Sequence, residues 1–263
     1  MSHRESRRID RRIRRWLRAR RRSAARPSVQ TLIDEAVRAV GKLARARIRP
    51  DHPWLTEYAN LLSENWLEEN LVHHRDFVQL VEEFAQRSAG GRTPRLLEAG
   101  AGSAAFSLML SRRNYDVTAV DADPLMVLRA QHISAHLGGY AKIVCLDLHE
   151  LAPFQDGFFD VVFSQGTFEH FDNATICALL DQQLRIGRTV VFSVPSLQWP
   201  TRDFVNERKM TTDDWKVLLQ EVDAQLLHLS YYRPGDQHVL VALTRNSARQ
   251  RPTLRESPGA GEA

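Results

Sequence analysis

Apolar strand patterns alternate with helical patterns along the middle of this 263-residue chain, and this alternation constrains the fold more than any other feature. The helical patterns lie at 103–113, 124–137 and 173–186. The strand patterns lie at 95–98, 116–121, 141–147, 159–164 and 188–195. Strands joined through helices lie parallel, with right-handed crossovers, and helices cover both faces of such a sheet. The sequence therefore predicts an α/β fold built on one mostly parallel sheet.

A carboxylate ends each of the first three strand patterns: Glu98, Asp121 and Asp147. Gly100-Ala101-Gly102 follows the first of them, and glycine lets the backbone approach a ligand that a side chain would block. Asp121 comes about 20 residues later, where related folds place a ribose-binding carboxylate. Ligands in such folds bind beyond the carboxyl ends of the strands. We therefore expect one site at that edge, and Glu98 suits a ligand with a positive charge.

As a set, these segments resemble the class I S-adenosylmethionine-dependent methyltransferases, in particular the broad branch that acts on small molecules. The segments that carry the resemblance are 97–102, 120–124, 145–148 and 159–171, and the likeness extends over residues 71–244. It implies a Rossmann-like sheet of seven strands whose last two form an antiparallel hairpin. Residues 224–232 and 237–244, separated by a Pro-Gly turn, fit that hairpin. One departure is Ser103-Ala104-Ala105 where many members have a third glycine, and alanine is small enough for close packing.

The resemblance implies S-adenosylmethionine as cofactor and gives a role to each matching residue. Glu98 would orient the methionine ammonium, Asp121 would accept from the ribose hydroxyls, and Asp147 would accept from the adenine amino group. The Leu148 N–H would reach the adenine ring, whereas Ser164 and Gln165 would face the sulfonium and the substrate. The implied cofactor-binding residues are Glu98, Gly100, Ala101, Gly102, Asp121, Ala122, Asp147, Leu148, Ser164 and Gln165.

The connection after the fifth strand pattern is long and leaves the sheet at the expected ligand edge. Long loops at such edges tend to be lids or recognition elements. Thr211 or Thr212 would then cap a helix, with Asp214 in its first turn. The alternative is a surface loop held by its own salt bridges. The substrate-side candidates in this connection are Trp199, Arg202, Asp203, Asn206 and Arg208.

His170, just beyond the fourth strand pattern, is the candidate general base. A base is needed only when the acceptor must lose a proton. Glu-His at this point occurs in relatives with different substrates, so a structural role in holding the loop is the competing interpretation.

Two other functions compete with methyl transfer. The glycine turn and Asp121 also satisfy a loose nicotinamide-dinucleotide pattern, which would make the chain an NAD(P)-dependent oxidoreductase. The third acid, Asp147, the run at 159–171 and the final hairpin argue against it. A non-catalytic module that only binds S-adenosylmethionine is the second alternative. No Asn-Pro-Pro-Tyr or Asp-Pro-Pro-Tyr follows the fourth strand, so methylation of nucleobase amino groups is not indicated, and a small-molecule acceptor is expected.

Charge divides the chain unevenly. Residues 1–50 hold 17 Lys and Arg against 4 Asp and Glu, whereas residues 51–263 hold 19 against 28. The pattern predicts a basic arm (1–28), N-terminal helices that cover the site (29–90), the catalytic core (91–245) and a disordered tail (246–263). The arm suits an anionic membrane surface or nucleic acid, or is a solvated extension or an organelle transit peptide. The acidic remainder argues against a body that grips nucleic acid by itself.

Two cysteines, Cys145 and Cys177, form no disulfide framework, and no apolar run approaches the roughly 20 residues that span a bilayer. A cytoplasmic location is the resulting expectation, with peripheral binding to a membrane through the arm as the alternative. No zinc-type spacing of Cys and His occurs, so no metal is expected. His73-His74 is interpreted as a pair on a helix surface.

Overall fold

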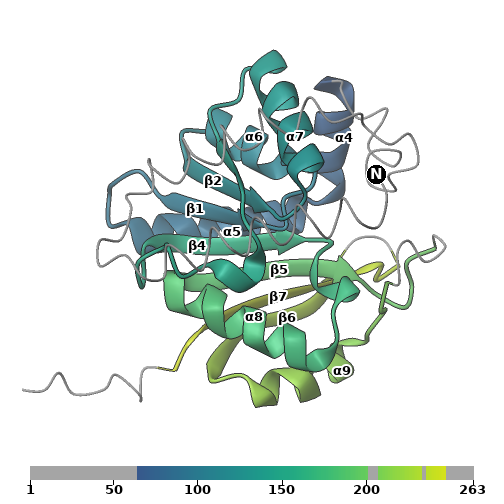
Figure 1. Cartoon of the computed structure of the whole chain (residues 1–263). Helices are drawn as coiled ribbons and strands as arrows, with labels where there is room; N and C mark the ends of the chain where they lie inside the picture. The colour runs from purple at the N-terminus through teal and green to yellow at the C-terminus, as the bar shows by residue number, and fades with distance from the viewer. Residues whose placement is uncertain (1–63, 201–206, 233–234, 247–263) are drawn as a thin grey trace, which may run out of the picture.

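Seven strands form one sheet in the order β3-β2-β1-β4-β5-β7-β6. The computed structural model describes residues 64–200, 207–232 and 235–246 (Figure 1). β1 to β5 run parallel, and β7 is antiparallel to both β5 and β6. The strands are β1 Arg95–Ala99, β2 Asp116–Asp121, β3 Lys142–Cys145, β4 Phe159–Gln165, β5 Gly187–Pro195, β6 Ala224–Tyr232 and β7 His238–Arg245. The predicted Rossmann-like fold with its C-terminal hairpin is confirmed.

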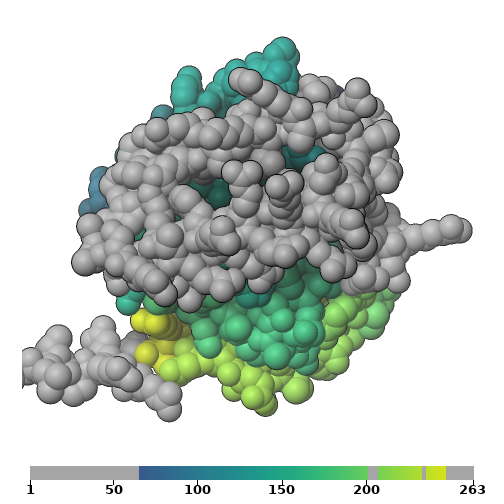
Figure 2. Space-filling view, viewed as in Figure 1, coloured from purple at the N-terminus to yellow at the C-terminus, as the bar shows by residue number. Residues whose placement is uncertain are grey.

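Helices cover both faces of this sheet. α5, α6 and α7 pack on one face, and α8 and α9 pack on the other, as the side chains of the buried clusters show. In the space-filling view, the green to yellow-green part that includes α8 and α9 forms the lower surface (Figure 2). The helices are α4 Glu64–His73, α5 Arg75–Ala89, α6 Ala105–Arg112, α7 Pro124–His136, α8 Asn173–Ile186 and α9 Thr212–Leu218, with short 3-10 turns η1 Leu148–Glu150, η2 Phe168–His170 and η3 Leu219–Glu221.

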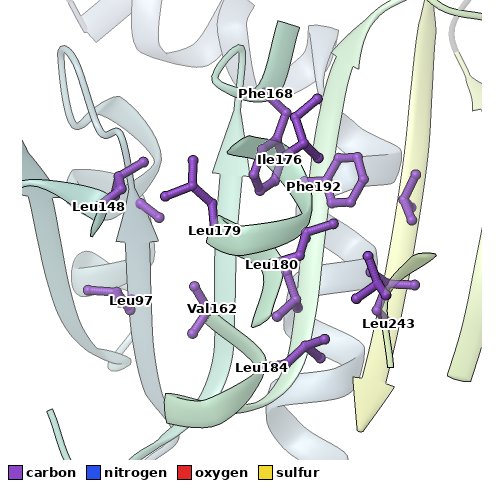
Figure 3. Close-up of a cluster of buried hydrophobic side chains, with 14 of the residues drawn as sticks. Leu97, Leu148, Val162, Phe168, Ile176, Leu179, Leu180, Leu184, Phe192 and Leu243 are labelled. Atoms are coloured by element: carbon purple, nitrogen blue, oxygen red, sulfur yellow. The ribbon is translucent and has the colours of Figure 1, made fainter. Parts of the chain in front are cut away.

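The core between α8 and the sheet is apolar on both sides. Leu179 and Leu180 from α8 lie against Val162 of β4 and Phe192 of β5, all fully buried (Figure 3). Each such side chain contributes on the order of 2 kcal/mol through burial. Strands that are apolar on both faces, such as β4 and β5, occupy the centre of a parallel sheet.

Side-chain caps explain where several helices begin. The Asp123 carboxylate accepts from the N–H of Leu125 at 2.8 Å, and Pro124 occupies the first turn of α7. Thr211 and Asp214 form a capping box at the start of α9, which confirms the predicted helix start.

Two predicted elements are shorter than the apolar patterns indicated. β3 ends at Cys145 rather than at Asp147, because the Asp147 side chain caps η1. α6 begins at Ala105 rather than at Ser103, since Gly102 and Ala104 adopt left-handed backbone conformations that cannot continue a helix. The predicted arm (1–28) and nearly all of the tail (246–263) lie outside the described residues, as does most of the segment 29–90.

Candidate functional site

Glu98 is the next-to-last residue of β1 and is buried, with 3% of its surface exposed. The backbone N–H of Ser107 on α6 donates to its Oε2 at 2.9 Å. Burial raises the pKa of the Glu98 carboxyl to about 7, and the negative charge of Asp121 adds to this rise. Because a buried carboxylate is costly without a cation, this position favours a cationic ligand group.

The turn after β1 has a conformation that glycine adopts easily. Gly100 and Gly102 have φ values of 72° and 51°. The N–H groups of Gly100 and Ala101 both donate to the Val120 carbonyl, at 2.9 and 3.0 Å, which fixes the turn against β2. A Cβ at Gly100 would lie 2.7 Å from Cγ2 of Thr167. Gly100 therefore leaves room for a close approach to the backbone, as predicted. The segment after β4, through Thr167, is one of the groups that make this approach.

Asp121 ends β2 beside this turn. Its Oδ2 accepts from the Gly102 N–H and its Oδ1 accepts from the Asp123 N–H, each at 2.8 Å. Burial raises the pKa of the Asp121 carboxyl. A carboxylate has about four lone-pair positions, so acceptor capacity remains for a ligand. Ala122, the next predicted cofactor residue, is exposed at the edge.

Asp147 follows β3 and is the most exposed of the three acids, with a side chain 54% exposed. Its Oδ1 accepts from the backbone N–H of His149 at 3.0 Å and lies 2.9 Å from His149 Nδ1. Leu148, the next residue, is buried. Since β3, β2 and β1 are neighbours in the sheet, the three acids share one edge, as the sequence predicted.

Ser164 and Gln165 end β4, the strand next to β1. Ser164 is 1% exposed, and its Oγ has no hydrogen-bond partner among the described residues, whereas Gln165 is half-buried. The Thr167 hydroxyl donates to the Ala99 carbonyl at 3.3 Å. This bond ties the segment after β4 to the glycine turn.

His170, the predicted base, closes η2. Its side chain is 18% exposed, and its Nε2 lies 4.0 Å from Glu169 Oε1, beyond hydrogen-bond distance. Its backbone N–H donates to the Thr167 carbonyl at 3.3 Å. Nothing in this geometry tests a catalytic role, which stays a prediction.

Trp199 and Arg208 are the described members of the predicted substrate set, and Arg202, Asp203 and Asn206 lie outside the described residues. The Trp199 ring packs edge-on against the ring of His238, with centroids 4.7 Å apart. Arg208 instead donates to the Phe171 carbonyl at 2.5 Å and to Asn173 Oδ1 at 2.6 Å. Its guanidinium thus connects η2 to the start of α8.

The interpretation of His73-His74 as a surface pair is wrong for His74. That side chain is 5% exposed, and its Nδ1 lies 2.8 Å from the Tyr232 hydroxyl. The same hydroxyl lies 2.5 Å from Ser193 Oγ of β5. Burial lowers the pKa of His74 to about 4, so the imidazole is neutral at neutral pH. The β6–β7 hairpin covers His74. The sequence around His74 does not show that this hairpin, far along the chain, packs against it.

Within the described ranges, no group of three Asp, Glu, His or Cys side chains is arranged to hold a metal ion. A shallow groove of about 560 Å³ lies between η3 and the start of β6. Ala224 there pairs with Arg245 at the end of β7, which places the groove at the opposite edge of the sheet from the three acids. We therefore assign the site to the acidic edge.

Sequence reasoning missed the contacts that complete this edge. Ser107 and Thr167 bond to it from α6 and from the segment after β4, without any local pattern that marks them. Glu169 is buried beside His170, and Glu207 lies on the segment before α9. The sequence did offer one indication that Glu169 is buried, because this acid stands between Phe168 and Phe171.

Comparisons with known proteins agree with this geometry. The family model described as a methyltransferase domain matches residues 97–192, which run from β1 into β5 and include all three acids. No curated protein matches the chain. None of the described helices is long and apolar enough to cross a bilayer.

Solved structures share the fold at low sequence identity. A magnesium protoporphyrin IX methyltransferase from Synechocystis PCC 6803, with bound S-adenosylhomocysteine, is 15% identical with a TM-score of 0.54, over 74% of this chain and 93% of that one. An S-adenosylmethionine-dependent methyltransferase from Aquifex aeolicus is 15% identical, at 0.56, over 75% and 98%. A protein from Pyrococcus horikoshii OT3 is 12% identical, at 0.58, over 73% and 99%.

Proposed function

We propose that the chain is a class I S-adenosylmethionine-dependent methyltransferase, and that it transfers the methyl group to a small-molecule acceptor bound beside η2. The observation that carries the proposal is the state of Glu98. Its carboxylate is buried, has a raised pKa and forms no ion pair with a described Lys or Arg. A ligand ammonium at this position would remove that cost.

The remaining cofactor contacts are proposed along the same edge. The backbone from Gly100 to Gly102 would lie along the methionine, and Asp121 would accept from the ribose hydroxyls. Asp147 and the Leu148 N–H would contact the adenine. Ser164 and Gln165 would lie near the sulfonium, with Ala122 beside the ribose. This assignment follows the order of β1, β2 and β3 in the sheet.

The chemistry asks mainly for positioning. S-adenosylmethionine supplies a methyl group that is already activated for transfer. The protein holds the acceptor in line with that group, which can lower the barrier by several kcal/mol. Carboxylates at the edge add a negative potential that favours a cationic ligand. The segment after β5, with Trp199, is proposed to cover the acceptor.

The proposal is tested first by binding. Isothermal titration of the full chain with S-adenosylhomocysteine should give saturable binding, whereas NAD and NADP should give none. Binding of NAD in place of S-adenosylhomocysteine would favour an oxidoreductase and overturn the proposal.

Turnover is tested with methyl-labelled S-adenosylmethionine and a metabolite extract. Label should appear in small molecules, because residues 51–263 hold 19 Lys and Arg against 28 Asp and Glu, a balance that does not favour a nucleic-acid acceptor. Binding of S-adenosylhomocysteine with no label transferred to any fraction would identify a non-catalytic module. A cytoplasmic location is proposed as well, since both cysteines are free thiols.

A further inference from the structure

Glu169 is a buried carboxylate beside the acceptor region. It lies in η2, directly after β4, and its side chain is 2% exposed. Its Oε2 has no hydrogen-bond partner among the described residues. Burial raises the pKa of the Glu169 carboxyl to about 8. An unpaired buried carboxylate is costly, so its presence calls for a proton or a cation that completes it.

A second carboxylate lies close to the first. Glu207 also has a buried Oε2 without a hydrogen-bond partner among the described residues. Its negative charge further raises the pKa of Glu169. The next residue, Arg208, donates its backbone N–H to the Glu169 carbonyl at 2.8 Å, which fixes this segment along η2. The two acids therefore form a pair, although 38 positions separate them in the sequence.

None of the ion pairs described for Lys and Arg side chains involves Glu169 or Glu207. The guanidinium of Arg208, the nearest in sequence, is used by Phe171 and Asn173. His170 Nε2 is 4.0 Å from Glu169 Oε1, too far for a hydrogen bond. The pair thus has no described cation paired with it and keeps at least two buried oxygens with unused acceptor capacity.

The pair lies at the same edge as the cofactor residues. A Cβ on Gly166, the first residue after β4, would lie 3.3 Å from Glu169 Oε1. Gly166 follows Gln165, which the resemblance places toward the sulfonium. Thr167 connects this segment to the glycine turn through the Ala99 carbonyl.

We propose that Glu169 and Glu207 together bind the protonated amine of the methyl acceptor, so that the substrate is an amine. The inference rests on the proposed methyl transfer. An ammonium carries three N–H donors and a positive charge, which matches two carboxylates with unused oxygens. A neutral hydroxyl would supply one donor and leave the charge of the pair uncompensated.

The same pair also explains where the ammonium proton goes, since the nitrogen must lose a proton before it can attack the methyl group. The ammonium gives one proton to the Glu169 carboxylate and becomes a neutral amine. Its nitrogen lone pair then forms the bond to the methyl carbon, and the carbon–sulfur bond breaks with its electron pair left on sulfur. The products are an N-methylated ammonium and a neutral thioether, and Glu169 later returns its proton to water.

The test uses the full chain with methyl-labelled S-adenosylmethionine and matched amine and alcohol probes of the same carbon skeletons. Label should enter amines and not the matched alcohols. Glu169→Gln should lower kcat/KM for the labelled amine by about 100-fold or more, and Glu207→Gln by about 10-fold. Glu221→Gln, an exposed acid in η3, is the matched control and should keep the wild-type rate.

A second readout does not depend on turnover. In the complex with S-adenosylhomocysteine, the amine probe should raise the melting temperature, and Glu169→Gln should remove that rise while its affinity for S-adenosylhomocysteine stays within twofold of wild type. Label that enters alcohols or carbon acceptors, or full amine turnover by both variants, would overturn this inference alone. Activity that is lost on chelation with EDTA and restored by Mg²⁺ would assign the pair to a metal ion and also overturn it. Failure of the wild type to bind S-adenosylhomocysteine would overturn the proposed function itself.

Discussion

The two halves of the acidic edge are built differently. The half at β1, β2 and β3 is held by backbone groups that bond to strand-end carboxylates, such as Gly102 N–H to Asp121. The half at β4, β5 and the β6–β7 hairpin is assembled from side chains that lie far apart in the sequence, such as His74 before α5 and Tyr232 of β6. The first half repeats one arrangement, a carboxylate at the end of a strand that accepts from backbone N–H groups. The second half depends on tertiary contacts. We infer that the first half serves the common cofactor and the second half serves the particular acceptor.

Removal of Asp121 should have the largest effect on the first half. Asp121→Ala deletes a carboxylate proposed to bind two ribose hydroxyls, and hydrogen bonds to charged groups contribute roughly 1.5–3 kcal/mol each. Affinity for S-adenosylhomocysteine, measured by titration calorimetry, should fall by about 100-fold or more. Asp116→Ala, at the other end of β2, removes only an exposed ion pair with Lys142 and is the control. Equal affinity of both variants would contradict the division into halves.

Stability should depend on pH through one carboxyl in each half. The pKa of Glu98 rises from 4.5 to about 7 and that of Glu169 from 4.5 to about 8 on folding. Between the unfolded and folded values, the native state binds more protons than the unfolded chain, so stability falls as pH increases. The contribution of these two carboxyls to the free energy of unfolding is on the order of a few kcal/mol. It is fully present below about pH 4.5 and is lost by about pH 8.

The measurement is urea unfolding of the ligand-free chain across pH 5 to 8. Glu98→Gln should flatten the profile between pH 5 and about 7, and Glu169→Gln should flatten it between pH 5 and about 8. S-adenosylhomocysteine should stabilise wild type more at pH 8 than at pH 5, because its ammonium would pair with ionised Glu98. A profile that rises with pH in both variants and wild type would refute this account.

Gly100 is the position where the two halves touch. Gly100→Ala places a Cβ 2.7 Å from Thr167 Cγ2 and imposes a φ of 72° on alanine. We expect a loss of about 2–3 kcal/mol in the free energy of unfolding. Gly157→Ala also has positive φ but meets nothing within 4 Å, so it should cost only about 1 kcal/mol. Thr167→Ala should rescue part of the larger loss, and the absence of any rescue would show that the clash is not its cause.

Tyr232→Phe should give the smallest effect and confine it to the second half. It removes the hydroxyl between His74 and Ser193, which costs about 1–2 kcal/mol of stability when buried partners are left unpaired. Affinity for S-adenosylhomocysteine should not change. Tyr140→Phe is the control, because Tyr140 is 80% exposed. A matching loss of cofactor affinity in Tyr232→Phe would join the halves into one unit.

Local pattern predicted the fold and the first half because both follow from short sequence spans. Each strand end that carries Glu98, Asp121 or Asp147 is visible as an apolar run with a terminal acid. The second half was predictable only in outline. His74 looked exposed because the hairpin strand that buries it lies 158 positions away. Likewise, nothing near Glu169 indicates that Glu207 would lie beside it.

The antiparallel course of β7 has a consequence for how such enzymes diversify. Because β7 runs opposite to β5, the tip of the last hairpin returns to the acceptor half, where Ser196 Oγ donates to the Asp236 carbonyl and Pro195 pairs with His238. A few residues inserted or exchanged at that tip would reshape the space proposed for the acceptor without moving any strand that leads to one of the three acids. A lineage could thus change its substrate through a hairpin tip while its donor chemistry stays the same.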